Sequence, residues 1–204
     1  MRTSEDGTMP RAVLFDAVGT LIFPDPPVAE AYHRLGRELG SSRTLAEIKE
    51  LFRDAYRRSE SLFALPGNDA GLARQPTSDD RERQRWRQVV GEVFGDLPAD
   101  LADAALEGLW RHFAQPAHWR LYDDVAAVWR NLTRRGFVLG IASNFDSRLE
   151  TICRGLPPLD QCRHVFISSQ IGYPKPAPQF FRTVEEQLGL RGEEILLVGD
   201  DWTN

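Results

Sequence analysis

Short apolar runs alternate with helical patterns through much of the chain. Residues 12–15, 137–142, 165–167 and 195–198 are four such runs, and each is followed by a polar residue or a glycine. Runs of this length, closed in this way, are typical of strands buried in a parallel sheet. Apolar residues at helical spacing between the later runs predict connecting helices. The alternation therefore predicts an α/β fold: a Rossmann-like, doubly wound parallel sheet with helices on both faces.

Residues 24–116 follow a different pattern, with apolar residues at helical spacing and no convincing strand. About four successive helices are expected there. One of them begins at a capping box, in which Thr44 is followed three residues later by Glu47. We therefore expect an all-α cap at residues 24–116, inserted into a core made of residues 10–23 and 117–204.

Composition and charge exclude some classes of function. The net charge of −5 argues against a nucleic-acid partner, and no apolar stretch approaches the ~18 residues that a membrane helix needs. The basic run at residues 81–87 is interpreted as the solvated face of a helix. Residues 1–9 are polar, lack the apolar segment of a secretory signal and are expected to be flexible. A cytoplasmic location follows, with Cys153 and Cys162 as reduced thiols.

Polar side chains follow several of the predicted strands. In a parallel sheet the carboxyl ends of the strands lie at one edge, where ligands bind. Taken singly, such residues are common in turns and helix caps. Together, carboxylates beside a lysine and a hydroxyl form a site for Mg²⁺ and a phosphoryl-like group. The set comprises Asp16, Ser143, Asn144, Lys175, Asp200 and Asp201.

Four segments, in this order and at this spacing, resemble the motifs of the haloacid dehalogenase-like hydrolases. They are residues 13–20, residues 142–144, Lys175 within Lys-Pro-x-Pro, and residues 198–201. The resemblance covers nearly the whole chain from about residue 10, and the helical insert occupies the place of the family's cap.

Several further features resemble one branch of this superfamily, typified by haloacid dehalogenase-like hydrolase domain-containing protein 3. They are residues 143–149, residues 172–176, and Trp86 and Trp119, which we assign to the cap.

The resemblance implies a role for each residue of the site. Asp16 would be the nucleophile that forms a covalent aspartyl intermediate. Thr20 and Ser143 would hydrogen-bond the transferring group, with Asn144 in the same catalytic set. Lys175 would neutralise negative charge on the nucleophile and the phosphoryl oxygens. The implied ligands of Mg²⁺ are Asp16, the backbone carbonyl of Val18, Asp200 and Asp201.

Val18 departs from the pattern of the family's phosphatases. They usually carry a second aspartate at this position as general acid and base, a role generally worth roughly 10²–10⁴ in rate. The family's dehalogenases also lack this acid, yet their fourth motif is typically Ser-Ser-Asn and they need no metal. The carboxylates of Asp200 and Asp201 therefore favour a magnesium-dependent phosphatase acting, slowly, on a small phosphorylated molecule. A 2-haloacid dehalogenase and a catalytically impaired binding protein of the same fold are the alternatives.

A few residues outside the motifs complete the expectations. Asp25 and Arg148 are candidates to face the substrate, although ordinary solvent exposure is the favoured interpretation of both. The four histidines lack the spacing of metal ligands. The family normally continues beyond the position of Asn204 with another acid, a helix and a further strand. The sequence does not indicate the oligomeric state or the identity of the substrate.

Overall fold

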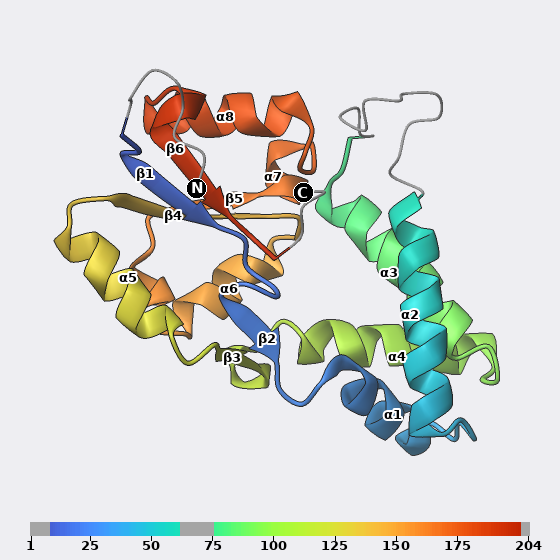
Figure 1. The fold of residues 1–204 in the computed structure, drawn as a ribbon. Helices are drawn as coiled ribbons and strands as arrows, with labels where there is room; N and C mark the ends of the chain where they lie inside the picture. Colours follow the sequence, from blue (N-terminus) through green and yellow to red (C-terminus); the bar gives the residue numbers. More distant parts are fainter. Residues whose placement is uncertain (1–8, 62–75, 201–204) are drawn as a thin grey trace.

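The main sheet has four parallel strands in the order β5-β4-β1-β6. A computed structural model describes residues 9–61 and 76–200 (Figure 1). All four predicted strands are confirmed, with bounds that differ by at most one residue. They are β1 (Ala12–Phe15), β4 (Val138–Ser143), β5 (His164–Ile167) and β6 (Ile195–Val198).

Helices cover both faces of this sheet, as Figure 1 shows. Successive residues of a strand face opposite sides. On β1, Phe15 packs with Trp129 of α5, whereas Leu14 packs in a cluster with Phe180 of α8. The doubly wound α/β fold is therefore confirmed. Its helices are α5 (Val125–Arg134), α6 (Arg148–Arg154), α7 (Ser168–Ile171) and α8 (Pro178–Leu188), with short 3₁₀ turns at Leu159–Gln161 and Gly192–Glu194.

Four helices between β1 and β4 form a second bundle with its own core. Tyr32 and Phe94 are buried at its centre, and their rings stack with centroids 5.8 Å apart. The capping box is present, because the Thr44 backbone N–H donates to Glu47 Oε2 and the Glu47 N–H donates to Thr44 Oγ1. The helices are α1 (Val28–Glu38), α2 (Leu45–Ser61), α3 (Asp79–Val93) and α4 (Ala99–His112). We propose residues 24–116 as the cap and residues 10–23 and 117–204 as the core.

A two-stranded antiparallel sheet joins the cap to the core. It consists of β2 (Ile22–Pro24) and β3 (Trp119–Leu121), which follows a 3₁₀ turn at Pro116–His118. These strands have no signature in the sequence, because three residues are too few to show alternation and a proline lowers the expectation of a strand. The assignment of Trp119 to the cap is wrong, because Trp119 lies on β3 and packs in the core cluster with Val125 and Leu149.

Two other expectations concern the chain as a whole. Within residues 9–61 and 76–200, no helix is both long and apolar enough to cross a membrane. Cys153 and Cys162 are both free thiols that pack in the same hydrophobic cluster as α5 and α6. Burial raises the pKa of the Cys153 thiol to about 12, and Cys162 adds to the shift.

Candidate active site

Asp16 stands at the carboxyl edge of the sheet, immediately after the central strand β1. Its backbone N–H donates to the carbonyl of Val198 on β6, 2.8 Å away, which fixes the start of the loop that follows. One carboxylate oxygen accepts a hydrogen bond from the Ala17 N–H at 2.7 Å. The other lies 3.0 Å from Nζ of Lys175. The side chains of Asp16 and Lys175 are 12% and 1% exposed, so this ion pair is largely shielded from water.

Asn144 holds Lys175 in this position. Its side-chain amide donates to the carbonyl of Lys175 at 3.0 Å, and its Oδ1 accepts the Lys175 N–H at 2.7 Å. Two bonds to one backbone unit fix the direction in which the lysine side chain leaves the chain. Ser143, the last residue of β4, is buried beside this pair of segments. Asp16 and Asn144 therefore both contact Lys175, one through its ammonium group and the other through its backbone.

The Asp200 carboxylate lies against the loop that follows Asp16. Thr20 Oγ1 donates to Asp200 Oδ1 over 3.4 Å, so the hydroxyl contacts a carboxylate of the same site. Gly19 has a φ of +89°, and a Cβ there would lie 2.3 Å from Asp200 Oδ2. Glycine is needed at this position both for the backbone conformation and for the space that the carboxylate occupies.

The residues at this edge offer oxygen atoms of the kind that magnesium binds. Asp16, Asp200 and the carbonyl of Val18 are hard oxygen donors, and Mg²⁺ is commonly held by one or two carboxylates plus substrate oxygens. No cluster of three or more histidine, cysteine or acidic side chains suited to a metal occurs within the described part of the chain. Asp201, the other predicted ligand, lies outside the described residues.

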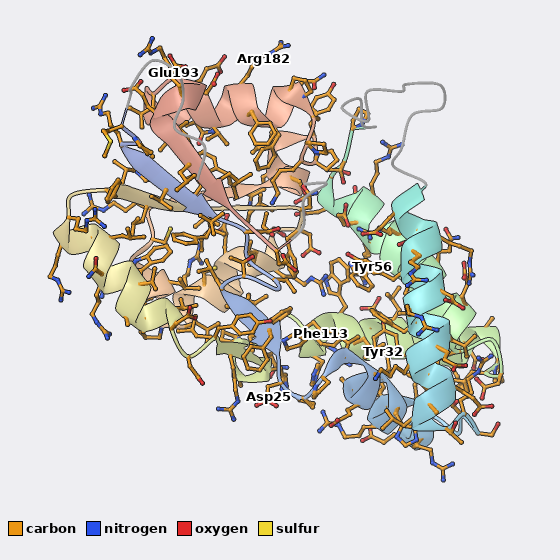
Figure 2. The ribbon with its side chains drawn as sticks, in the orientation of Figure 1. Asp25, Tyr32, Tyr56, Phe113, Arg182 and Glu193 are labelled. Atoms are coloured by element: carbon orange, nitrogen blue, oxygen red, sulfur yellow. The ribbon has the colours of Figure 1, made fainter. Side chains whose placement is uncertain are left out.

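A cavity of about 260 Å³ lies between the cap and the core, next to this site. Val18 and Asn144 line its core side, and the Val18 side chain is exposed. Eight of the other described lining residues are aromatic. Figure 2 labels three of them, Tyr32, Tyr56 and Phe113, on the cap helices and the residue that follows α4.

Two ion pairs also line the cavity. Glu82 pairs with Arg85 at 3.4 Å on α3, and both side chains are largely buried. The interpretation of residues 81–87 as a solvated face is therefore wrong for these two residues. The run has hardly any apolar residues that would mark a buried face, so the pattern hides the inward-facing pair.

The second pair joins Asp146 and Arg148. Two contacts of 2.7 Å connect the guanidinium to the carboxylate, and the Asp146 side chain is 2% exposed. The guanidinium carbon also lies 3.6 Å from the ring centroid of Trp110 on α4. Arg148 thus lines the cavity, whereas Asp25 forms an ion pair with Arg120 beside the β2–β3 sheet.

A separate set of hydrogen bonds ties the cap to the core. Asp79, the first residue of α3, accepts a hydrogen bond from the Ser147 N–H at 3.0 Å and another from Ser169 Oγ at 2.6 Å. The Thr77 N–H donates to the carbonyl of Gly172 at 2.8 Å. Burial raises the pKa of Asp79, but the hydrogen bonds from Ser169 and Ser147 outweigh it and hold the pKa below its usual value. The sequence marks Asp79 only as an acid at a helix start.

A comparison with known families identifies the chain. The family described as "Hydrolase: haloacid dehalogenase-like hydrolase" matches residues 10–204. The chain belongs to the haloacid dehalogenase-like hydrolases. The haloacid dehalogenase-like hydrolase domain-containing protein 3 of Homo sapiens is 31% identical over 198 residues, which are 94% of this chain and 74% of that protein. The resemblance to that branch is thereby confirmed, and the protein is a hydrolase.

Solved structures of two kinds share the fold. A defluorinating L-2-haloacid dehalogenase superposes with a TM-score of 0.69 at 18% identity, covering 98% of this chain and 77% of that one. A predicted phosphoglycolate phosphatase from Haemophilus somnus superposes with a TM-score of 0.62 at 16% identity, covering 94% and 77%. At these identities the likeness concerns the fold alone. The α/β class is confirmed, and the reaction has to be argued from the site.

Proposed function

We propose that this hydrolase is a magnesium-dependent phosphatase that acts on a small phosphorylated molecule through an aspartyl-phosphate at Asp16. The observation that carries the proposal is the buried contact of 3.0 Å between Lys175 Nζ and Asp16 Oδ2, beside a second carboxylate at Asp200. Phosphoryl transfer depends mainly on positioning and on neutralising charge, and this arrangement supplies both.

Each residue has a defined part in the proposed reaction. A carboxylate oxygen of Asp16 attacks phosphorus, and the bond from phosphorus to the leaving-group oxygen breaks. The Lys175 ammonium, held by Asn144, offsets the charge on Asp16 and on the transferring phosphoryl oxygens. Bound Mg²⁺, held by Asp16, Asp200 and the carbonyl of Val18, would supply further positive charge. Water then attacks the aspartyl-phosphate, which releases phosphate and restores the Asp16 carboxylate.

Val18 limits which substrates are turned over quickly. A valine side chain cannot give the leaving oxygen a proton, so that oxygen must depart as an anion or take its proton from water. We expect acyl and aryl phosphates to react much faster than simple alkyl phosphates. Val18→Asp should raise turnover of an alkyl phosphate by roughly 10²-fold. Val18→Asn should not, because asparagine matches aspartate in size but cannot act as a general acid.

The first test measures phosphate release from acetyl phosphate and p-nitrophenyl phosphate with and without Mg²⁺. Asp16→Asn should abolish release, because the amide is not a nucleophile. Asp25→Asn is the matched control, since Asp25 lies in the β2–β3 ion pair, and it should retain activity. Phosphate release that is undiminished in Asp16→Asn, or that is equally fast with and without Mg²⁺, contradicts the proposal.

Val18 also favours a second candidate, a 2-haloacid dehalogenase, because a halide leaves without needing a proton. In that reaction Asp16 would attack the halogen-bearing carbon, and water would hydrolyse the resulting ester. Halide release from 2-chloropropionate in the presence of a chelator tests it. We rank it second because Asp200 places a carboxylate where a substrate carboxylate would be repelled in the absence of a metal.

A further inference from the structure

The cavity between cap and core is lined mainly by apolar and aromatic side chains, whereas the adjoining site holds the Asp16–Lys175 ion pair. We infer that it takes an uncharged aromatic group of one or two rings, carried by the leaving group of the substrate. This inference rests on the proposed function, because it specifies the part of the substrate that departs from the phosphoryl group.

The position of the cavity places a leaving group in it. Val18 and Asn144 belong to its wall. Val18 lies two residues after Asp16, and the Asn144 side chain hydrogen-bonds the backbone of Lys175. A phosphoryl group at Asp16 would therefore have the cavity beside it. Because the other lining residues come mostly from the cap helices, a group that extends away from the phosphoryl group reaches the cap.

Size and lining indicate an aromatic occupant. An apolar cavity of about 150 Å³ holds a benzene molecule, so a volume of about 260 Å³ has room for a substituted ring or a fused pair of rings. Trp86 and Trp110 line it with Tyr56 and Phe145, and planar rings favour offset or edge-to-face contacts with another ring.

The charges in the wall argue against an anionic occupant. The four charged residues that the structure describes in the wall form two ion pairs, Glu82 with Arg85 and Asp146 with Arg148. Arg85 also donates to Ser59 Oγ at 2.9 Å, and the Arg148 guanidinium lies on the Trp110 ring. Among the described residues of the wall, a carboxylate or second phosphate could gain a cation only by breaking one of these buried pairs, which is unfavourable.

Three acyl phosphates test the inference while keeping the leaving groups similar in acidity. Phenylacetyl phosphate carries a neutral ring, acetyl phosphate fills almost none of the cavity, and succinyl phosphate carries a carboxylate. We expect kcat/KM for phenylacetyl phosphate to exceed that for acetyl phosphate by a factor on the order of 100, with succinyl phosphate no better than acetyl phosphate. Equal values for phenylacetyl and acetyl phosphate, or a preference for succinyl phosphate, would overturn the inference.

A variant that fills the cavity tests the same inference from the side of the protein. Val28 lines the cavity from the start of α1 and is only partly buried, so Val28→Trp puts an indole into it from the edge. The ratio of kcat/KM for phenylacetyl over acetyl phosphate should fall at least tenfold. Val128→Trp, on the exposed face of α5, is the control and should leave the ratio unchanged. An unchanged ratio in a folded Val28→Trp variant contradicts the assignment.

A binding measurement separates this inference from the proposed reaction. Saturation-transfer NMR should detect phenylacetamide on the wild-type protein, weakly or not at all on Val28→Trp, and should not detect succinamate. Binding without any Asp16-dependent turnover would refute the phosphatase proposal and leave the aromatic site standing. Turnover of acetyl phosphate without binding of phenylacetamide would refute the aromatic site alone.

Discussion

Replacing Arg148 with methionine should strongly destabilise the protein. The substitution keeps much of the apolar stem but leaves the carboxylate of Asp146, which is 2% exposed, without the two guanidinium contacts of 2.7 Å. Removing one partner of a buried ion pair generally costs about 3–5 kcal/mol. The lost stacking on Trp110, at 3.6 Å, places the expected cost toward the upper end. For a chain of this size the midpoint of thermal unfolding should fall by roughly 10 °C or more.

Urea unfolding of two arginine variants isolates the effect of burial. Arg154→Met is the matched control, because Arg154 forms an exposed ion pair with Glu150 one helical turn away. Such pairs generally contribute about 0.3–0.5 kcal/mol. The double variant Asp146→Asn with Arg148→Met removes both charges of the buried pair, so it should be more stable than Arg148→Met alone.

The difference between the two arginine variants shows whether the Asp146–Arg148 pair is shielded from water. If Arg148→Met costs no more free energy of unfolding than Arg154→Met, the Asp146–Arg148 pair is not shielded from water. Arg148 could then pair with an anionic group in the cavity, which would contradict an uncharged occupant.

Three other predictions concern single side chains. Asp79→Ala should speed hydrogen exchange of the Ser147 amide, measured by mass spectrometry, because the amide loses its acceptor. The pKa of Asp79 is lowered in the folded protein. The stabilisation from this contact is therefore fully present above the ordinary carboxyl pKa and is lost as the pH falls through the pKa of Asp79 in the folded protein. Burial and His118 lower the pKa of His112 to about 4, so unfolding free energy should fall as the pH drops from about 6.5 toward that value, and His112→Phe should flatten this part of a denaturation series. Cys153 should resist Ellman's reagent at pH 8 in the folded protein and react once urea unfolds it, and rapid labelling of the native thiol would contradict its burial.

Much of the sheet domain was predictable because its strands are buried on both faces. Such strands appear in the sequence as continuous apolar runs, and β1 ends directly at Asp16. The rule that strand ends share one edge then places Lys175 and Asp200 near Asp16 without knowledge of any contact. The contact between Lys175 and Asp16 agrees with that placement.

The cavity and its ion pairs could not be predicted in the same way. Glu82 and Arg85 lie within a stretch of alternating charges, and only the packing of α3 against its neighbours turns them inward. Asp79 meets Ser169 across 90 residues of sequence, a contact that depends on how the cap sits over α7. The strands β2 and β3 are stabilised by each other, so neither has a signal of its own.

The short β2–β3 sheet has a consequence for how such a protein can change over evolution. Pro24, where the chain departs for the cap, pairs with Trp119, where it returns. Because exit and return are neighbouring positions, inserts of very different length could bridge them without moving Asp16 or the strands behind it. The reactive carboxylate and the surface that selects its substrate can therefore vary independently, as exchangeable modules of one chain.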